Sequence, residues 1–184
     1  EPKPKAEAPP APLEIPRYRY RSPRKPADGN RREAAPVFER GVKAQRDQRL
    51  TAASGDYQPA IRLDPAYFEA YYNLALAARA VGDLSATLNA YELALAITPD
   101  SVNALYNFAF TLQEAGYYQD SANELRKLLL IAPNETRAHL LLGNLCAQRL
   151  NQAVPAREHY LKVLQAEPQH PQATQIRYWL AAHP

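Results

Sequence analysis

Apolar residues recur at intervals of three and four along most of this chain, from about Ala34 to Ala182. This spacing places them on one face of an α-helix, so the sequence predicts an all-α fold. The pattern also repeats, because the segment YYNLA at 71–75 returns thirty-four residues later as LYNFA at 105–109. A fixed period of this length is typical of stacked helix pairs rather than of a globule with a single core.

Glycine and proline mark the predicted helix ends. Gly82 and Gly116 follow the first helices of two successive pairs, where glycine can adopt the left-handed conformation. Prolines at a spacing of thirty-four residues close the second helices: Pro65, Pro99 and Pro133. The next closing proline, Pro168, comes after thirty-five residues, so the turn of the fourth unit should be one residue longer.

These signals divide the chain into three parts. Residues 1–36 form an extended arm or linker, residues 37–168 a helical repeat array, and residues 169–184 a further helix that caps the exposed end of the array. The first repeat unit should be irregular, because Gly55 and Pro59 lie inside its second helix and both residue types destabilise helices.

The arm is rich in proline, with nine of the seventeen prolines of the chain in residues 1–36. Proline fixes φ and removes a hydrogen-bond donor, so this segment should be extended and unable to build a core. Because it contributes almost no apolar residues, we expect the array to fold without residues 1–36. Thirteen Lys/Arg and seven Asp/Glu give residues 1–49 a net charge of +6, whereas residues 50–184 carry −3.

Arginine and tyrosine alternate from Arg17 to Arg21, and more basic residues follow. One interpretation is a solvated linker that its charge keeps extended. The other is a docking arm, in which alternation at period two puts the tyrosines on one side and the arginines on the other, as pairing with the edge of a partner's sheet requires. The residues expected to dock are Arg17, Tyr18, Arg19, Tyr20, Arg21, Arg24 and Lys25.

The repeat resembles the tetratricopeptide repeat (TPR) over roughly residues 34–168. The resemblance rests on small residues at the eighth position of the unit, large or aromatic residues at the fourth, seventh and twenty-fourth positions, and the closing prolines. Examples are Ala75 and Ala109 at the eighth position and Tyr57, Tyr91 and Tyr160 at the twenty-fourth. It implies a right-handed superhelix of antiparallel helix pairs, with about four units and the C-terminal capping helix.

The TPR resemblance also implies a concave groove that receives an extended peptide or a partner helix and is lined by the first helix of each pair. The candidate peptide-binding residues in this groove are Tyr72, Asn73, Leu76, Tyr106, Asn107, Phe110, Leu141 and Asn144. The surface should be aromatic and amide-rich with little charge. Asn73 and Asn107 occupy equivalent places and could hold a ligand's backbone, although tyrosine and asparagine at these positions also serve packing between repeats.

No catalytic, cofactor-binding or metal-binding constellation is present in the sequence. Cys146 is the only cysteine, which leaves no disulfide and no paired-cysteine metal motif. His139 lies two helical turns from Cys146, too far for a nucleophile and its base, and a buried thiol is expected instead of a dyad with His159. The six glycines are scattered singly, so no phosphate-binding loop exists. We therefore expect no enzyme and no cofactor.

The leading hypothesis is a protein–protein interaction scaffold or adaptor within a larger complex, docked or tethered by its basic arm. Alternatives are a nucleic-acid-associated protein or an anionic lipid contact through residues 17–32, and self-assembly of the repeats into oligomers or filaments. The spacer, rich in Pro, Lys and Ala, resembles those of membrane-anchored bacterial envelope proteins, which suggests a periplasmic or membrane-tethered protein, with the cytoplasm as the alternative. A chain that begins at Glu1 and lacks Met suggests a processed product or part of a longer protein.

Overall fold

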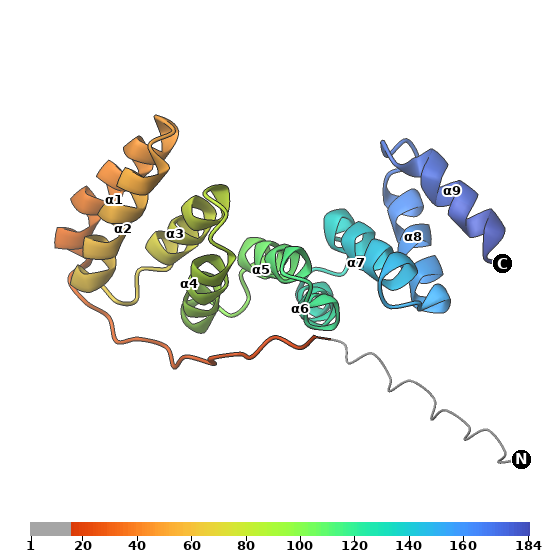
Figure 1. Cartoon of the computed structure of the whole chain (residues 1–184), viewed down its shortest axis with the longest axis horizontal. Coiled ribbons are helices and arrows are strands. Elements are labelled where there is room, and N and C mark those ends of the chain that lie inside the picture. Colours follow the sequence, from red (N-terminus) through yellow and green to blue (C-terminus); the bar gives the residue numbers. More distant parts are fainter. Residues whose placement is uncertain (1–15) are drawn as a thin grey trace, which may run out of the picture.

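A computed structural model describes residues 16–184 of the chain. These residues form helices and connecting segments without a β-strand, as the sequence predicts. Consecutive helices pack as antiparallel pairs that stack side by side into an arc (Figure 1). The helices are α1 (Arg31–Arg46), α2 (Leu50–Leu63), α3 (Phe68–Ala80), α4 (Leu84–Ile97), α5 (Val102–Glu114), α6 (Tyr118–Ile131), α7 (Thr136–Gln148), α8 (Ala153–Ala166) and α9 (Ala173–Ala182).

Glycine ends the first helices of the two middle pairs, as predicted. Gly82 and Gly116 adopt left-handed conformations with φ of 82° and 84°. Around Gly82, the N–H of Asp83 donates to the carbonyl of Ala78, which is the hydrogen bond of a Schellman motif. Gln48 follows α1 with a similar left-handed conformation at φ 60°, which a residue with a side chain adopts less easily than glycine does.

The closing prolines also act as predicted. The residues before them, Asp64, Thr98, Ala132 and Glu167, all have non-helical backbones, with φ between −126° and −138° and ψ between 79° and 94°. A proline disfavours the helical region for the preceding residue, so each second helix ends at the same place in its unit.

The structure corrects two predictions, namely that the arm extends to residue 36 and that the first repeat unit is irregular. Helix α1 begins at Arg31, so residues 31–36 belong to the array, where the side chain of Asn30 caps the helix and Ala34 is fully buried. Helix α2 runs without a break through Gly55 and Pro59. Its buried residues pack between α1 and α3, and this tertiary packing outweighs the low helix propensity.

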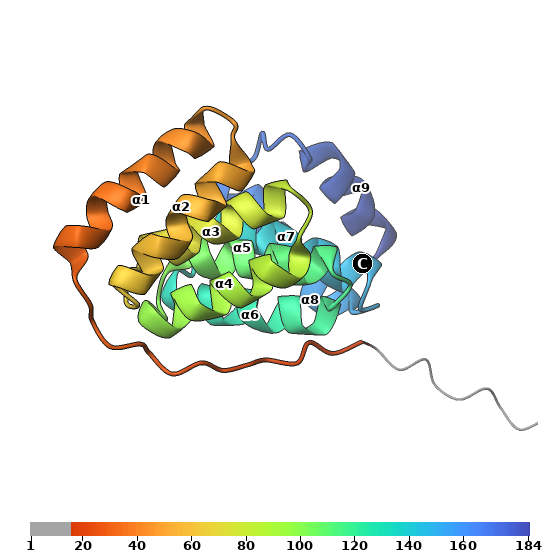
Figure 2. The same cartoon turned by 60° about the vertical axis from the view of Figure 1, so that its left-hand side comes forward.

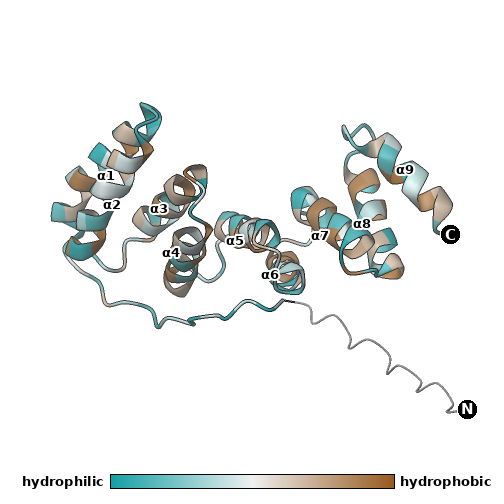
Figure 3. Ribbon diagram, in the orientation of Figure 1, coloured by the Kyte–Doolittle hydropathy of each residue, from teal (hydrophilic) through white to brown (hydrophobic). Residues whose placement is uncertain are grey.

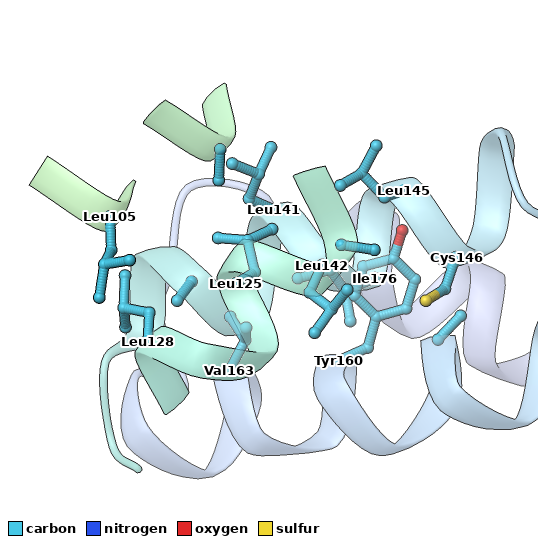
Figure 4. Close-up of a cluster of buried hydrophobic side chains, with 14 residues drawn as sticks. Leu105, Leu125, Leu128, Leu141, Leu142, Leu145, Cys146, Tyr160, Val163 and Ile176 are labelled. Carbon is cyan, nitrogen blue, oxygen red and sulfur yellow. The ribbon is translucent and has the colours of Figure 1, made fainter. Parts of the chain in front are cut away.

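The core is a chain of three apolar clusters along the array. The C-terminal cluster joins α5 to α9 and contains Leu125, Leu142, Tyr160 and Ile176 (Figure 4). Helix α9 contributes Ala173 and Ile176 to burial and leaves Tyr178 79% exposed, as fits a terminal helix.

Residues 16–30 form an extended segment on the outside of the arc. This segment crosses α6 and α4 before it reaches the start of α1 (Figures 1 and 2). Hydrophilic residues dominate it, whereas apolar and polar residues alternate along the helices (Figure 3). Residues 1–15 lie outside the described part of the chain, so the predicted extended structure there stays a prediction.

Candidate functional site

The first candidate surface is the concave face of the arc, which α3, α5 and α7 line (Figure 1). Seven of the eight groove residues predicted from the sequence are half-buried on these helices, so each offers part of its side chain to solvent. They are Tyr72, Asn73, Leu76, Tyr106, Asn107, Phe110 and Asn144.

The eighth, Leu141, does not line the groove. Its side chain is only 6% exposed and belongs to the C-terminal cluster (Figure 4). Leu141 continues the buried stripe of Ala138, Leu142 and Leu145 at helical spacing, so it faces the neighbouring helices. The half-buried neighbour in α7 is Leu140.

Two of the predicted amide groups in the groove are engaged within the protein. Asn107 Nδ2 donates to Tyr72 Oη at 2.8 Å, and Asn144 Oδ1 accepts from Tyr160 Oη at 2.9 Å. Asn73 has no hydrogen-bond partner for its side chain within residues 16–184. Asn73 is therefore the amide that is available to a ligand, and Asn107 also serves packing between repeats.

The groove carries more charge than the sequence suggests. Arg79 donates two hydrogen bonds to Glu114, at 2.7 and 2.9 Å, and its guanidinium lies 4.6 Å from the centre of the Phe110 ring. Arg137 lies 4.9 Å from the centre of the Tyr106 ring. Cations therefore lie over two aromatic rings of a surface that was expected to carry little charge.

Clefts flank the groove residues at both ends of the array. One of about 480 Å³ is lined by residues of α1 to α3 that include Tyr57, Asn73 and Leu76. An adjacent cleft of about 470 Å³ also has Leu76 in its wall. A third, of about 590 Å³, lies between α7 and α9 and contains Asn144 and Trp179.

The second candidate surface is the convex side of α4 and α6, where the arm lies against buried carboxylates. Asp120, which is 1% exposed in the first turn of α6, accepts from Arg17 Nη2 at 2.8 Å and from the backbone N–H of Tyr18 at 2.7 Å. Arg17 Nε lies 3.1 Å from both carboxylate oxygens. The hydrogen bond with Asp120 raises the pKa of the Arg17 guanidinium.

Glu92 in α4 is the second anchor of the arm. The Tyr18 hydroxyl donates to one of its oxygens at 2.5 Å, and the backbone N–H groups of Arg21 and Ser22 donate to the other at 2.9 Å each. Ser22 has a left-handed backbone with φ 49°, which costs about 1–2 kcal/mol for a residue other than glycine. The carboxylate is 6% exposed.

Two further carboxylates fix the arm at either end. Glu124, one turn after Asp120 in α6, accepts from the Tyr20 hydroxyl at 2.9 Å. At the other end Asp64 accepts from the N–H of Gly29 at 2.9 Å and from the Arg31 guanidinium. Although burial alone would raise the pKa of Asp64, these hydrogen bonds outweigh it and lower that pKa.

Tyr18 and Tyr20 lie on one side of the arm, with ring centres 5.0 Å apart. Both meet the ring of Phe108 edge-on, and Tyr18 also contacts Tyr117. Burial, followed by the neighbouring carboxylates, raises the pKa of both phenols. The expectation that the arm contributes almost no apolar residues to the core needs a correction, because Tyr18 packs on the cluster around Phe108.

Four of the seven predicted docking residues, Arg17, Tyr18, Tyr20 and Arg21, contact this chain's own helices. Arg19, Arg24 and Lys25 are exposed and form no hydrogen bond or ion pair within residues 16–184. Docking on a partner's sheet stays a prediction.

The carboxylates that receive the arm, Glu92, Asp120 and Glu124, were missed by the sequence analysis. Two signals point to them: the opposite net charges of the arm and the array, and acidic residues at helical spacing with buried ones, as in Asp120, Glu124 and Leu128.

The histidines and the cysteine that the sequence offered as possible reactive groups contact other groups of the array. His139 Nε2 lies 2.9 Å from the carbonyl of Pro133, which can only accept, so His139 Nδ1 accepts from His159 Nδ1 at 3.0 Å. Cys146 is fully buried in the C-terminal cluster, and burial raises the pKa of its thiol (Figure 4). Residues 16–184 contain no group of acidic, histidine and cysteine side chains suited to a metal ion, and no helix among them is long and apolar enough to span a membrane.

Comparison with known proteins agrees with this architecture. A family model described as tetratricopeptide repeat matches residues 78–145. A TPR protein from Parabacteroides merdae has a TM-score of 0.76 at 23% identity, over 81% of this chain and 59% of that one, so this chain spans less than two thirds of it. None of the curated proteins is significantly similar in sequence.

Two other solved structures share the fold. YrrB, described as a TPR protein with an unusual peptide-binding site, has a TM-score of 0.72 at 18% identity over 82% of this chain and 75% of that one. Pseudomonas aeruginosa pilF has a TM-score of 0.66 at 20% identity, over 84% and 78%. The family match over residues 78–145, the thirty-four-residue period and the stacked helix pairs together show that the described residues have the fold of tetratricopeptide repeats.

Proposed function

We propose that this protein is a non-catalytic interaction scaffold that binds an extended peptide or a helix of a partner protein in the groove of α3, α5 and α7. TPR proteins bind other proteins or peptides, and the fold is generally an interaction module. The observation that carries the proposal is the surface around Leu76, which borders two adjacent clefts beside the unengaged amide of Asn73.

The chemistry of this surface suits a peptide. An amide side chain offers both donors and an acceptor, so Asn73 can bind the backbone of a ligand whatever its sequence. Leu76 supplies an apolar contact at the same place, and Arg79 with Glu114 supplies charge one turn further along. YrrB, which shares the fold, is described as having a peptide-binding site, and this supports the proposal.

The test is a peptide-display selection against the full chain, followed by affinity measurements for each selected peptide by fluorescence anisotropy. Asn73→Ala and Leu76→Glu should each weaken binding by about tenfold or more, equal to about 1.4 kcal/mol. Leu161→Glu is the matched control, because Leu161 is 47% exposed on α8, away from the groove. Equal affinities for all four proteins would refute a groove ligand.

The contacts of the arm with the array weigh against the alternative that residues 17–32 bind an anionic partner such as a nucleic acid or a lipid. Both tyrosine hydroxyls and the Arg17 guanidinium are engaged by carboxylates of the array. The exposed cations of the segment that form no hydrogen bond or ion pair within residues 16–184 are Arg19, Arg24, Lys25 and Arg32. Binding of RNA or lipid through stacked tyrosines would require release of the arm. We therefore favour a protein partner.

We further propose a place in a complex of the bacterial cell envelope, on the strength of the Pro/Lys/Ala-rich spacer alone. Fractionation of cells that produce the native protein tests this, because recovery with the cytoplasmic fraction only would contradict it.

A further inference from the structure

Glu92 and Asp120 on the convex face form a built site whose carboxylates the array itself does not use. Within residues 16–184, every hydrogen bond to the Glu92 and Asp120 side chains comes from the arm. Both side chains are less than 7% exposed. The arm contributes to this burial, and it also supplies the hydrogen bonds that a buried carboxylate requires.

The contacts select a particular sequence in an extended backbone. The first position needs a guanidinium for Asp120, the second a tyrosine for Glu92, and the fourth a tyrosine for Glu124. The third position, Arg19, is exposed and unrestricted. Backbone N–H groups of Tyr18, Arg21 and Ser22 fix the register of the segment.

The connection to α1 is suited to a detachable ligand. Between Ser22 and Gly29 the chain makes no hydrogen bond to the array through residues 23–28, which include Pro23 and Pro26. The arm is anchored again at Gly29 and Arg31. A short covalent link of this kind gives the arm an effective concentration in the millimolar range at its site.

We propose that the convex face of α4 and α6 is a second peptide-recognition site, specific for an extended Arg-Tyr-x-Tyr segment, which the chain fills with its own residues 17–22. A partner segment with the same pattern binds there only by displacing the arm. The site lies on the opposite side of the array from the groove, so this inference does not depend on the proposed groove function (Figure 1).

The test uses a fluorescent peptide with the sequence of residues 16–22 and the full chain. The variant Arg17→Ala/Tyr18→Ala/Tyr20→Ala removes the three side chains that reach the carboxylates, so its arm should compete only weakly for the site. We expect this variant to bind the peptide at least tenfold more tightly than the wild type, whose own arm competes. Adding Glu92→Gln and Asp120→Asn to the variant should then weaken binding at least tenfold.

Two controls keep the outcome unambiguous. A peptide with alanine in place of both tyrosines should not bind, and Leu76→Glu in the groove should leave peptide binding by the arm variant unchanged. Should the arm variant fail to fold, hydrogen exchange on the wild type replaces it, because millimolar peptide should speed exchange at Tyr18, Arg21 and Ser22. Equal affinity of wild type and arm variant, binding that survives the carboxylate changes, or unchanged exchange in that replacement measurement would overturn the proposal.

Discussion

At the scale of single residues, Gly41 and Tyr57 show why the eighth position of the repeat must be small. A Cβ at Gly41 would lie 2.6 Å from the Tyr57 ring, and one at Gly143 would lie 2.9 Å from the Tyr160 ring. Tyr57 has little room to move, because it is fully buried and its hydroxyl donates to Gln45 at 2.6 Å. Burial is the main cause that raises the pKa of Tyr57 to about 12.

Gly41→Ala should therefore destabilise the protein. Overpacking costs about 1–3 kcal/mol, while replacing a helical glycine by alanine returns about 1 kcal/mol, so we expect a net loss of roughly 1 kcal/mol. Urea denaturation measures the difference. Gly55→Ala is the matched control in α2, because a Cβ there meets no atom within 4 Å, and it should stabilise by about 0.5–1 kcal/mol. A stabilising Gly41→Ala would contradict the steric explanation.

At the scale of elements, the contact between α7 and α8 contains the pair of His139 and His159. Burial, then His139 and then Arg126 lower the pKa of His159 from 6.5 to about 4. As the pH falls, His159 is therefore protonated near pH 6.5 in the unfolded chain but only near pH 4 in the folded protein. The contribution of neutral His159 to the free energy of unfolding is complete above pH 6.5 and is lost as the pH falls from 6.5 to 4.

His159→Gln should make stability less sensitive to pH in this window. Glutamine can still donate to His139 Nδ1 but does not take up a proton, so the loss in Tm between pH 7 and pH 4 should be smaller in the variant than in the wild type. Differential scanning calorimetry at several pH values measures both curves. Parallel curves would mean that His159 titrates normally in the folded protein.

Local sequence signals predicted most element boundaries, and long-range contacts account for the failures. Gly82 and the prolines act on their own neighbours, so their effects can be read from the sequence. Pro59 led to the wrong prediction of an irregular helix, because the packing of α2 between its neighbours outweighs the low helix propensity of proline. The arm pairs with Glu92 and Asp120 across about seventy to a hundred residues, and the local pattern around these carboxylates does not say which distant segment covers them.

At the scale of the whole molecule, the arm breaks the rule that each repeat contacts only its neighbours. Helices of the array pack on those next in sequence, as in other stacked repeats. The arm instead joins the start of α1 to α4 and α6 through Asp64, Glu92 and Asp120. Loss of the arm should therefore reduce the cooperativity with which the first three repeats unfold.

Truncation separates the arm from the first helix. Removing residues 1–22 deletes the docked segment, whose hydrogen bonds to charged groups contribute about 1.5–3 kcal/mol each before the cost of ordering the segment. We expect a net loss of about 1–3 kcal/mol, or roughly 2–10 °C in Tm, with the helical signal retained.

Removing residues 1–36 should be much more damaging, because it also cuts away the Asn30 cap, the ion pair of Arg31 with Asp64, and the fully buried Ala34. Each of these acts on α1 itself rather than on the arm, and loss of a cap alone costs about 1 kcal/mol. Thermal melts followed by circular dichroism should therefore rank the intact chain above the shorter truncation and place the longer one well below both. If the two truncations melted together, residues 23–36 would add nothing to the array, and the start of α1 at Arg31 would have no energetic consequence.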